Sequence, residues 1–231
     1  MLAEAGLLSI PCNVPPYRLS GAVYGTLLNH RSQLELLGNA VNLPPYGAPP
    51  RAPVLHIKPR NTLALSDEAV RIPPGTPELE VGACLGLVIG RAACRLSESR
   101  ALDHVAGYLI VVDISVPHAS FHRPSIRYKA RDGFCPMGPA VTARAEIANP
   151  DALTIRVHVD EVLMQTSSTA DLIRPAARLL QDVTEFMTLA PGDVLAVGAA
   201  APAVRVRAGQ SVRIEIPGLG EIKTPFLDAA A

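Results

Sequence analysis

The chain has 231 residues, 48% of them hydrophobic and 18% charged, which is enough apolar sequence to bury one sizeable core. Its 21 basic and 21 acidic residues balance, which argues against nucleic acid or an anionic membrane as a partner, because both select a basic surplus. No apolar run approaches the roughly 18 residues of a membrane span, and the start, MLAEAGLLSIPC, lacks the basic segment of a signal peptide. We therefore expect a cytoplasmic protein whose 4 cysteines, which lack zinc-ligand spacing, are reduced thiols.

The 22 prolines and 17 glycines interrupt the chain so often that its elements must be short, which favours strands over long helices. Segments rich in Val, Ile and Leu and bounded by turn residues are predicted strands: 21–28, 54–58, 85–89, 108–112, 153–159, 194–197 and 212–216. A short helix is predicted over 97–104. A longer one is predicted over 171–187, where apolar residues recur every three or four positions. The fold class is therefore β-rich α+β, with residues 1–20 as a leader and 21–231 as a single domain.

Two glutamates, Glu78 and Glu80, precede the third predicted strand in the stretch PELEVGACLGLVIG. Carboxylates two residues apart on an extended chain share a face and can bind a divalent ion together. The alternative is that they form only the exposed approach to a buried strand.

Polar residues are most informative between positions 113 and 139. Asp113 follows the apolar run GYLIVV, so a carboxylate lies where a buried strand ends, a common position for a ligand or an acid-base group. Further along, Arg127, Lys129 and Asp132 lie within six residues of one another. This segment is either a solvated charged turn or an anion pocket, in which Arg127 and Lys129 share one face of an extended chain and bind a carboxylate.

Two histidines, His118 and His122, lie four residues apart in the same region. Pro117 and Pro124 oppose the helix that would bring them together, so a two-histidine metal site is not expected. The alternative that one of these two histidines faces the substrate stays open.

In several stretches the sequence resembles the fumarylacetoacetate hydrolase family. The matching stretches are GTLLNHRSQL, APPRAPVLHIKPRNTL, LVIGR, AGYLIVVDIS, RPSIRYKARDGFCPMGP, TADLI and EFMTLAPGDVL. The resemblance covers about residues 24–216, and RYKARDGFCPMGP is its most specific part. It implies a fumarylacetoacetase C-terminal-domain-like roll of mixed β-sheet, with a few short helices and one longer helix.

The resemblance also implies a reaction: decarboxylation or isomerisation of a 2-oxo di- or tricarboxylic acid from meta-cleavage of an aromatic ring, as in 4-hydroxyphenylacetate catabolism. In the family a divalent ion, usually magnesium, is bound by a Glu-x-Glu pair and an aspartate and stabilises the enolate. Asp113 matches that metal-binding aspartate, and Lys129 matches the family lysine, to which we assign a catalytic role. We assign substrate binding to Arg127, Asp132 and Gln165.

The chain departs from the family pattern at the metal site. When the VIG runs are aligned, the two family glutamates fall at Gly82 and Cys84, and neither is a hard oxygen ligand. Glu78 and Glu80 lie four residues upstream, roughly 13 Å away in an extended strand, which favours the exposed-approach interpretation. The histidine base of hydrolytic relatives falls at Gln33. Magnesium binding by this chain alone is therefore not expected.

Three interpretations of the whole chain follow. In the first, which we favour, it is one subunit of a homo- or hetero-oligomeric decarboxylase/isomerase and contributes substrate-binding or interface residues beside a sister subunit with an intact metal site. In the second, it is a catalytically silent scaffold for that partner. In the third, Asp113 binds metal with the help of glutamates that the alignment misplaces. The roles of Arg127, Lys129 and Gln165 distinguish the first two.

Overall fold

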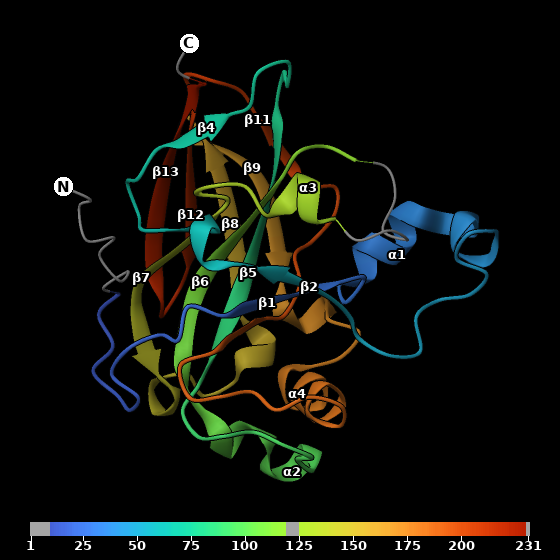
Figure 1. Ribbon diagram of the computed structural model, residues 1–231, viewed down its shortest axis with the longest axis vertical. Helices are drawn as coiled ribbons and strands as arrows, with labels where there is room; N and C mark the ends of the chain where they lie inside the picture. The colour runs from blue at the N-terminus through green and yellow to red at the C-terminus, as the bar shows by residue number, and fades with distance from the viewer. Residues whose placement is uncertain (1–9, 119–124, 230–231) are drawn as a thin grey trace.

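The computed structural model of this protein describes residues 10–118 and 125–229, which form thirteen β-strands and four α-helices (Figure 1). The strands are β1 (Val23–Leu27), β2 (Val54–Lys58), β3 (Leu63–Ala64), β4 (Val70–Ile72), β5 (Leu79–Ile89), β6 (Val105–Ser115), β7 (Cys135–Ala143), β8 (Thr154–Val159), β9 (Val162–Ser168), β10 (Val194–Ala196), β11 (Val204–Val206), β12 (Ser211–Ile216) and β13 (Gly220–Asp228). The helices are α1 (Arg31–Leu37), α2 (Glu98–Ala101), α3 (Ile126–Lys129) and α4 (Ala176–Thr184).

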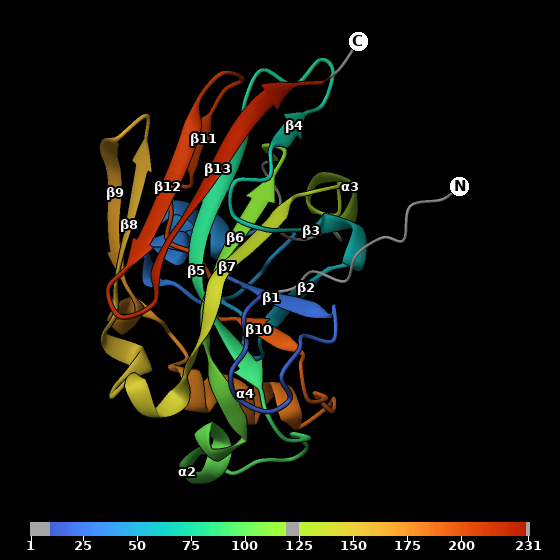
Figure 2. The same ribbon diagram turned by 90° about the vertical axis from the view of Figure 1, so that its left-hand side faces the viewer.

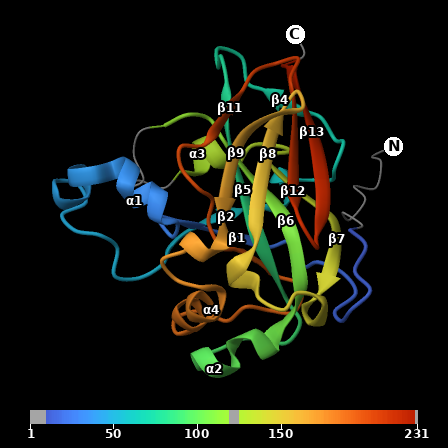
Figure 3. The same ribbon diagram turned by 180° about the vertical axis from the view of Figure 1, so that it is seen from behind.

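The strands form two sheets. The larger has the order β2-β1-β10-β5-β6-β7-β3, with β11 also paired to β5, and it mixes parallel and antiparallel neighbours. The smaller has the order β4-β13-β12-β8-β9. In the side view of Figure 2, β8, β9 and β12 lie to one side of the long strands β5 and β6, and in Figure 3 they are seen in front of them. This arrangement confirms the predicted β-rich roll of mixed sheet.

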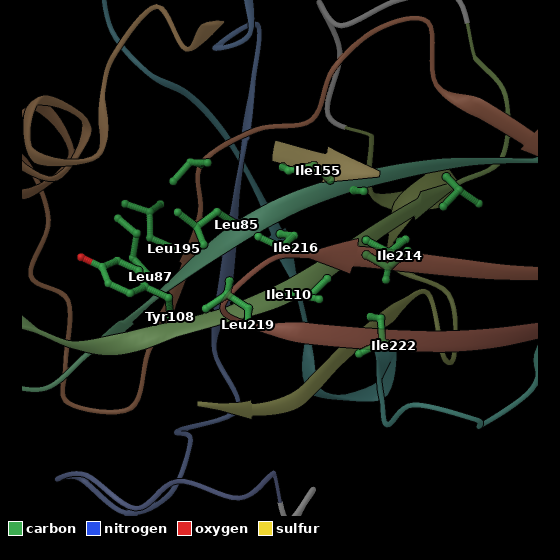
Figure 4. Packing of buried hydrophobic residues seen from close by; sticks show 14 of the residues in the cluster. Leu85, Leu87, Tyr108, Ile110, Ile155, Leu195, Ile214, Ile216, Leu219 and Ile222 are labelled. Atoms are coloured by element: carbon green, nitrogen blue, oxygen red, sulfur yellow. The ribbon is translucent and has the colours of Figure 1, made fainter. Parts of the chain in front are cut away.

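The main core lies between the two sheets, and side-chain alternation on β5 and β6 decides which residues enter it. Odd-numbered residues of β5, such as Leu85 and Leu87, and even-numbered residues of β6, such as Ile110, point into this core. They pack there with residues from β8, β12 and β13, including Ile214 and Ile222 (Figure 4). The opposite face of β5 and β6 is therefore left for other contacts, and it is this face that carries the site described below.

A smaller apolar cluster covers part of that opposite face. It includes Cys84, Val111 and Met137 of the larger sheet, together with Ile10 and Cys12, whose segment forms an isolated bridge to β7. Each of the four cysteines is a free thiol. None of the helices in the part of the chain that the structure describes has the length and apolar character needed to span a membrane.

All seven predicted strands are present, although β5 and β6 are each eleven residues long and begin before the apolar runs that predicted them. The predicted helix over 97–104 is also present, as α2 and a short 3-10 turn. The longer helix is shorter than predicted. It begins only at Ala176 because Pro175, which lacks a backbone N–H, precedes it and disfavours helical geometry at Arg174. The upstream residue Leu172 instead pairs with His30 in an isolated β-bridge.

The apolar stripe predicted for this helix is confirmed as core packing, because Leu179, Leu180 and Val183 are all fully buried. We expect Leu180→Ala to lower the free energy of unfolding by about 2–5 kcal/mol, since it leaves a cavity that neighbouring side chains fill only partly. Urea unfolding measures the change. A control substitution, Leu36→Ala on the exposed face of α1, should cost less than about 1 kcal/mol. Equal losses for both variants would contradict the assignment of Leu180 to the core.

Candidate active site

The candidate site is centred on Asp113, near the end of β6. In the antiparallel pairing of β5 with β6, Asp113 lies directly opposite Gly82, and Glu80 lies opposite Ser115. Because side chains alternate along a strand, Glu80, Gly82 and Cys84 share one face of β5, the face that points away from the main core. Asp113 points to this same face of the sheet, where the chain has a carboxylate opposite a glycine.

Two lysines bind the Asp113 carboxylate, one at each oxygen. Lys58 Nζ of β2 lies 2.9 Å from Oδ1, and Lys129 Nζ of α3 lies 2.6 Å from Oδ2. The Nε2 atom of His56 lies 3.4 Å from Oδ2. Burial alone would raise the pKa of Asp113, but the charges of Lys129 and Lys58 outweigh it and hold the pKa well below its usual value. Asp113 is therefore a carboxylate, both of whose oxygens already face a cation.

Lys58 is buried, with 1% of its surface exposed, and its contacts fix it as an ammonium ion. Besides Asp113, its Nζ donates to the carbonyl oxygens of Ile114 (2.7 Å), Lys129 (3.0 Å) and Phe134 (2.9 Å). Burial lowers the pKa of Lys58, yet a nitrogen surrounded by four oxygen acceptors requires all three of its N–H groups. Lys58 therefore supplies a fixed positive charge that ties β6 to the segment around α3.

His56 is held against β1 in its neutral form. Burial lowers its pKa and outweighs the nearby Asp113 carboxylate, which raises it, while the charges of Lys129 and Lys58 act in the same direction as burial. A Cβ atom at Gly25 on β1 would lie 2.1 Å from the His56 ring, so the ring can occupy this position only because residue 25 is glycine. The site consequently contains one carboxylate and two ammonium ions, an excess of one positive charge.

A pocket of about 260 Å³ opens beside this cluster, and we call it the Asp113 pocket. Its lining residues come from β1, α1, β5, β6, α3 and the loop after β10: Thr26, Leu27, Gln33, Leu36, Leu37, Glu80, Gly82, Asp113, Ser115, His118, Lys129, Ala199, Ala200, Ala201 and Ala203. The volume suits a small organic acid, because pockets for larger, drug-sized ligands occupy about 300–1,000 Å³. One wall is the helix α1, which projects from the sheets in Figures 1 and 3.

The structure separates Arg127 from Lys129. The extended geometry expected for them is wrong, because both belong to α3. Two residues on a helix differ by about 200° around its axis, so the two side chains point in nearly opposite directions. Lys129 is buried in the Asp113 pocket, whereas Arg127 is exposed and is not part of the pocket lining.

The other two residues predicted to bind substrate also lie outside the Asp113 pocket. Asp132 is exposed and accepts a hydrogen bond of 2.7 Å from Asn61 Nδ2. Gln165, on β9, donates from Nε2 to the carbonyl oxygen of Pro202 (2.7 Å) and lines a second, more open pocket. In this chain, of the five predicted site residues, the structure brings together only Asp113 and Lys129.

His118 is oriented in the Asp113 pocket by three neighbours. Its Nδ1 lies 3.0 Å from the carbonyl oxygen of Val116 and 3.2 Å from Ser115 Oγ, and its ring stacks on Tyr128 with a centroid distance of 4.8 Å. Because a carbonyl oxygen only accepts, Nδ1 donates the hydrogen bond to Val116. Ser115 is therefore not activated as a nucleophile by this histidine. His122 lies outside the described residues.

Glu78 and Glu80 are not simply an exposed approach to the strand. Both side chains are partly buried and form ion pairs with Arg205 on the neighbouring strand β11, and Glu78 also pairs with Arg207. Glu80 belongs to β5 itself and lines the Asp113 pocket. Its carboxylate nevertheless forms an ion pair with Arg205 at a distance of 3.3 Å. Arg205 therefore compensates the charge of the acidic pair beside an apolar strand.

The magnesium ion implied by the family resemblance does not fit the donor atoms present here. Both oxygens of Asp113 face ammonium ions, and a Cβ atom at Gly82 would lie 2.8 Å from the Cβ of Ala199, closer than real side chains approach. Cys84 is buried, and burial raises the pKa of its thiol well above the usual value, so it stays protonated. No group of three or more His, Cys, Asp or Glu residues among those described is placed to bind a metal ion.

Sequence reasoning missed Lys58 and His56. Both lie in the strand VLHIK, two residues apart and therefore on one face. A signal was available, because the chain contains only three lysines and one of them ends this largely apolar strand. Lysine is rarely buried without a paired charge, so a lysine in such a strand predicts a buried carboxylate partner. The identity of that partner required the fold.

Comparisons with known proteins show which proteins this chain is similar to. The family model described as "Fumarylacetoacetate (FAA) hydrolase C-terminal" matches residues 22–227. A bifunctional isomerase/decarboxylase of 4-hydroxyphenylacetate degradation from Escherichia coli is 39% identical over 210 residues, which cover 91% of this chain and 48% of that protein. The mitochondrial oxaloacetate tautomerase fahd2 of Xenopus laevis is 32% identical over 188 residues, covering 77% of this chain and 59% of that protein. The chain thus spans about half the length of these curated relatives.

Solved structures show the same fold. A 5-carboxymethyl-2-hydroxymuconate delta-isomerase from Mycobacterium smegmatis superposes with a TM-score of 0.79 at 25% identity, covering 93% of this chain and 82% of the other. A 2-hydroxyhepta-2,4-diene-1,7-dioate isomerase from Mycobacterium marinum gives a TM-score of 0.77 at 25% identity, covering 93% and 77%.

Proposed function

Because this chain belongs to the fumarylacetoacetate hydrolase family, we propose that it acts as a subunit of a decarboxylase/isomerase for 2-oxo di- or tricarboxylic acids from meta-cleavage of aromatic rings. Relatives that carry the names of such enzymes support this substrate class. Since the chain spans about half the length of the bifunctional relative, we further propose that it assembles with a second copy or with a sister subunit, in the cytoplasm.

The observation that carries this proposal is the Lys129–Asp113 ion pair in the wall of the Asp113 pocket. Lys129 is 6% exposed, so its charge acts where water screens it little. Loss of carbon dioxide from such an acid, or migration of a proton along its conjugated chain, places negative charge on the 2-oxo oxygen. A fixed ammonium ion beside that oxygen stabilises the charge as it develops.

His118 is suited to the proton-transfer part of this chemistry. Its imidazole lines the Asp113 pocket and is oriented by Val116 and Tyr128, and an imidazole can take a proton from one carbon of a substrate and return it to another. Gln33, which stands where hydrolytic relatives have a histidine, cannot do so, because an amide does not titrate in this range. We therefore assign proton transfer to His118 and charge stabilisation to Lys129.

If Lys129 contacts substrate in the assembled enzyme, Lys129→Ala should lower turnover by roughly ten- to a hundredfold, which corresponds to about 1.4–2.8 kcal/mol of lost transition-state stabilisation. The measurement is steady-state decarboxylation by the complex purified after co-expression with its candidate partner. Lys223→Ala is a matched control, because Lys223 is an exposed lysine on β13 that pairs with Glu161, outside the Asp113 pocket.

Size-exclusion chromatography of each variant shows whether the complex still assembles. Full activity of the Lys129→Ala complex would contradict the proposal. It would instead support the interpretation of this chain as a catalytically silent scaffold, which the presence of Gly82 and Cys84 at the positions of the family glutamates also favours. Lost assembly would show that Lys129 stabilises the interface and does not serve the substrate.

A further inference from the structure

The charge balance of the Asp113 pocket is incomplete without an anion. Lys58 and Lys129 carry two positive charges and Asp113 one negative charge, while burial keeps His56 neutral. The remaining carboxylate of the lining, Glu80, is paired with Arg205. An uncompensated charge in a buried site is costly, so the pocket favours a ligand that brings negative charge.

The excess charge is available at Lys129 and not at Lys58. Lys58 Nζ is surrounded by three carbonyl oxygens and Asp113, which use all of its hydrogens. Within the described part of the chain, Lys129 Nζ has one hydrogen-bond partner, Asp113 Oδ2. An ammonium ion has three N–H groups, so Lys129 retains two for a ligand in the pocket that it lines.

Two further polar groups of the lining lack a protein partner among the described residues. Thr26 Oγ1 and Gln33 Oε1 are both buried and accept or donate no hydrogen bond. The Thr26 hydroxyl can donate to an anionic oxygen, and the Gln33 amide can accept from a hydroxyl group. Together with Lys129, they match a ligand that carries a carboxylate and an adjacent oxo or enol oxygen.

The same geometry offers no free set of protein oxygens to the divalent ion that would otherwise bind those two ligand oxygens. Asp113 already has an ammonium ion at each oxygen, and Ala199 closes the space above Gly82. We propose that the Asp113 pocket binds the 2-oxo-acid end of its ligand without a metal ion, with the Lys129 ammonium group as the cation that contacts the ligand oxygens. This inference deepens the proposed function and rests on it for the substrate class.

Oxalate is a suitable probe, because it presents two adjacent pairs of carboxylate oxygens and does not react. Isothermal titration calorimetry on the full chain, first freed of metal with EDTA, should show oxalate binding whose Kd changes less than about twofold when magnesium is added. Lys129→Met should weaken binding at least about tenfold, equivalent to about 1.4 kcal/mol. Lys223→Met should leave it unchanged. Titration with magnesium alone should reveal no stoichiometric site tighter than about millimolar, the range of weak protein sites for divalent ions.

A second variant covers the case in which Lys129→Met does not fold. Thr26→Val changes no charge and keeps a similar volume, and it should weaken oxalate binding about three- to tenfold with an unchanged melting temperature, as expected for the loss of one hydrogen bond of about 1 kcal/mol from the Thr26 hydroxyl. Oxalate binding that requires magnesium would overturn the inference. So would a tight magnesium site that Asp113→Ala removes. The absence of oxalate binding both with and without magnesium would overturn it as well. The proposed function is tested separately. If oxalate binds without metal but the Lys129→Ala complex decarboxylates its substrate at the wild-type rate, only the proposed function is contradicted.

Discussion

Replacing Asp113 with alanine should lower the free energy of unfolding by about 3–5 kcal/mol, the cost typical of breaking a buried ion pair by removing one partner. The reason is the pair of lysines that the substitution leaves behind. Lys58 and Lys129 are 1% and 6% exposed, and without the carboxylate two positive charges remain close together with little access to water. Desolvation and mutual repulsion then both act against the folded state.

Urea unfolding followed by circular dichroism measures this loss. Asp103→Ala is the matched control: Asp103 also pairs with two cations, Arg100 and Arg144, but all three side chains are at least two-fifths exposed. Surface pairs of this kind contribute about 0–1 kcal/mol each. A loss below about 1 kcal/mol for Asp113→Ala would show that the lysines are not buried in the folded protein.

The dependence of this effect on pH has a definite sign. The folded-state pKa of Asp113 is depressed, so its contribution to stability is present above the unfolded-state value of about 3.9 and is lost as the pH falls through the folded-state pKa. The difference in stability between the wild type and Asp113→Ala should therefore shrink below about pH 3.9. The pKa of His56 is also lowered, so acidification below about pH 6.5 further destabilises both proteins, because the unfolded chain binds that proton more readily.

Lys58→Met should also cost about 3–5 kcal/mol, again the range for removing one member of a buried ion pair. Methionine fills a similar volume but donates no hydrogen bond. The substitution removes the donor to three carbonyl oxygens, those of Ile114, Lys129 and Phe134, and leaves Asp113 with one cation in place of two. These contacts join β2, β6 and the segment around α3, so several elements lose support at once.

Lys223→Met provides the control for this second substitution, since it changes the same residue type at an exposed position on β13. Its effect should stay within about 0.5 kcal/mol, as for most surface substitutions. Similar melting temperatures for Lys58→Met and the wild type would contradict the buried network. A loss confined to Lys58→Met would show that burial, and not the type of residue, determines the cost.

Much of the fold was predictable because apolar runs and breakers are local signals. Leu179, Leu180 and Val183 repeat with helical spacing, and the structure buries all three. The helix start was predicted wrongly because the apolar residues Leu172 and Ile173 fit the same spacing, while Pro175 decides where helical hydrogen bonding can begin. Strand β13 was missed because charged and polar residues interrupt its apolar ones, and β9 was missed because its apolar start is only three residues long and is followed by polar residues.

The site was less predictable, because it depends on contacts between residues far apart in the chain. Asp113 and Lys129 were found through a sequence pattern, yet Lys58 lies 55 positions before Asp113 and reaches it only when β2 enters the same sheet as β6. Arg127 was misplaced for a local reason: four residues of helix, α3, are too few to leave a periodic signal. The charge pattern was informative about residue types and uninformative about the directions in which they point.

The close approach of Ala199 to Gly82 also constrains how this chain can evolve. A mutation that introduces glutamate at position 82 alone would drive the new side chain into Ala199, while a change of Ala199 to glycine alone would open a gap with no carboxylate to fill it. The lysines that pair with Asp113 would still compete with any divalent ion for its oxygens. Installing a Glu-x-Glu ligand pair in this chain would therefore require several coordinated substitutions, because each one alone is unfavourable in the present surroundings.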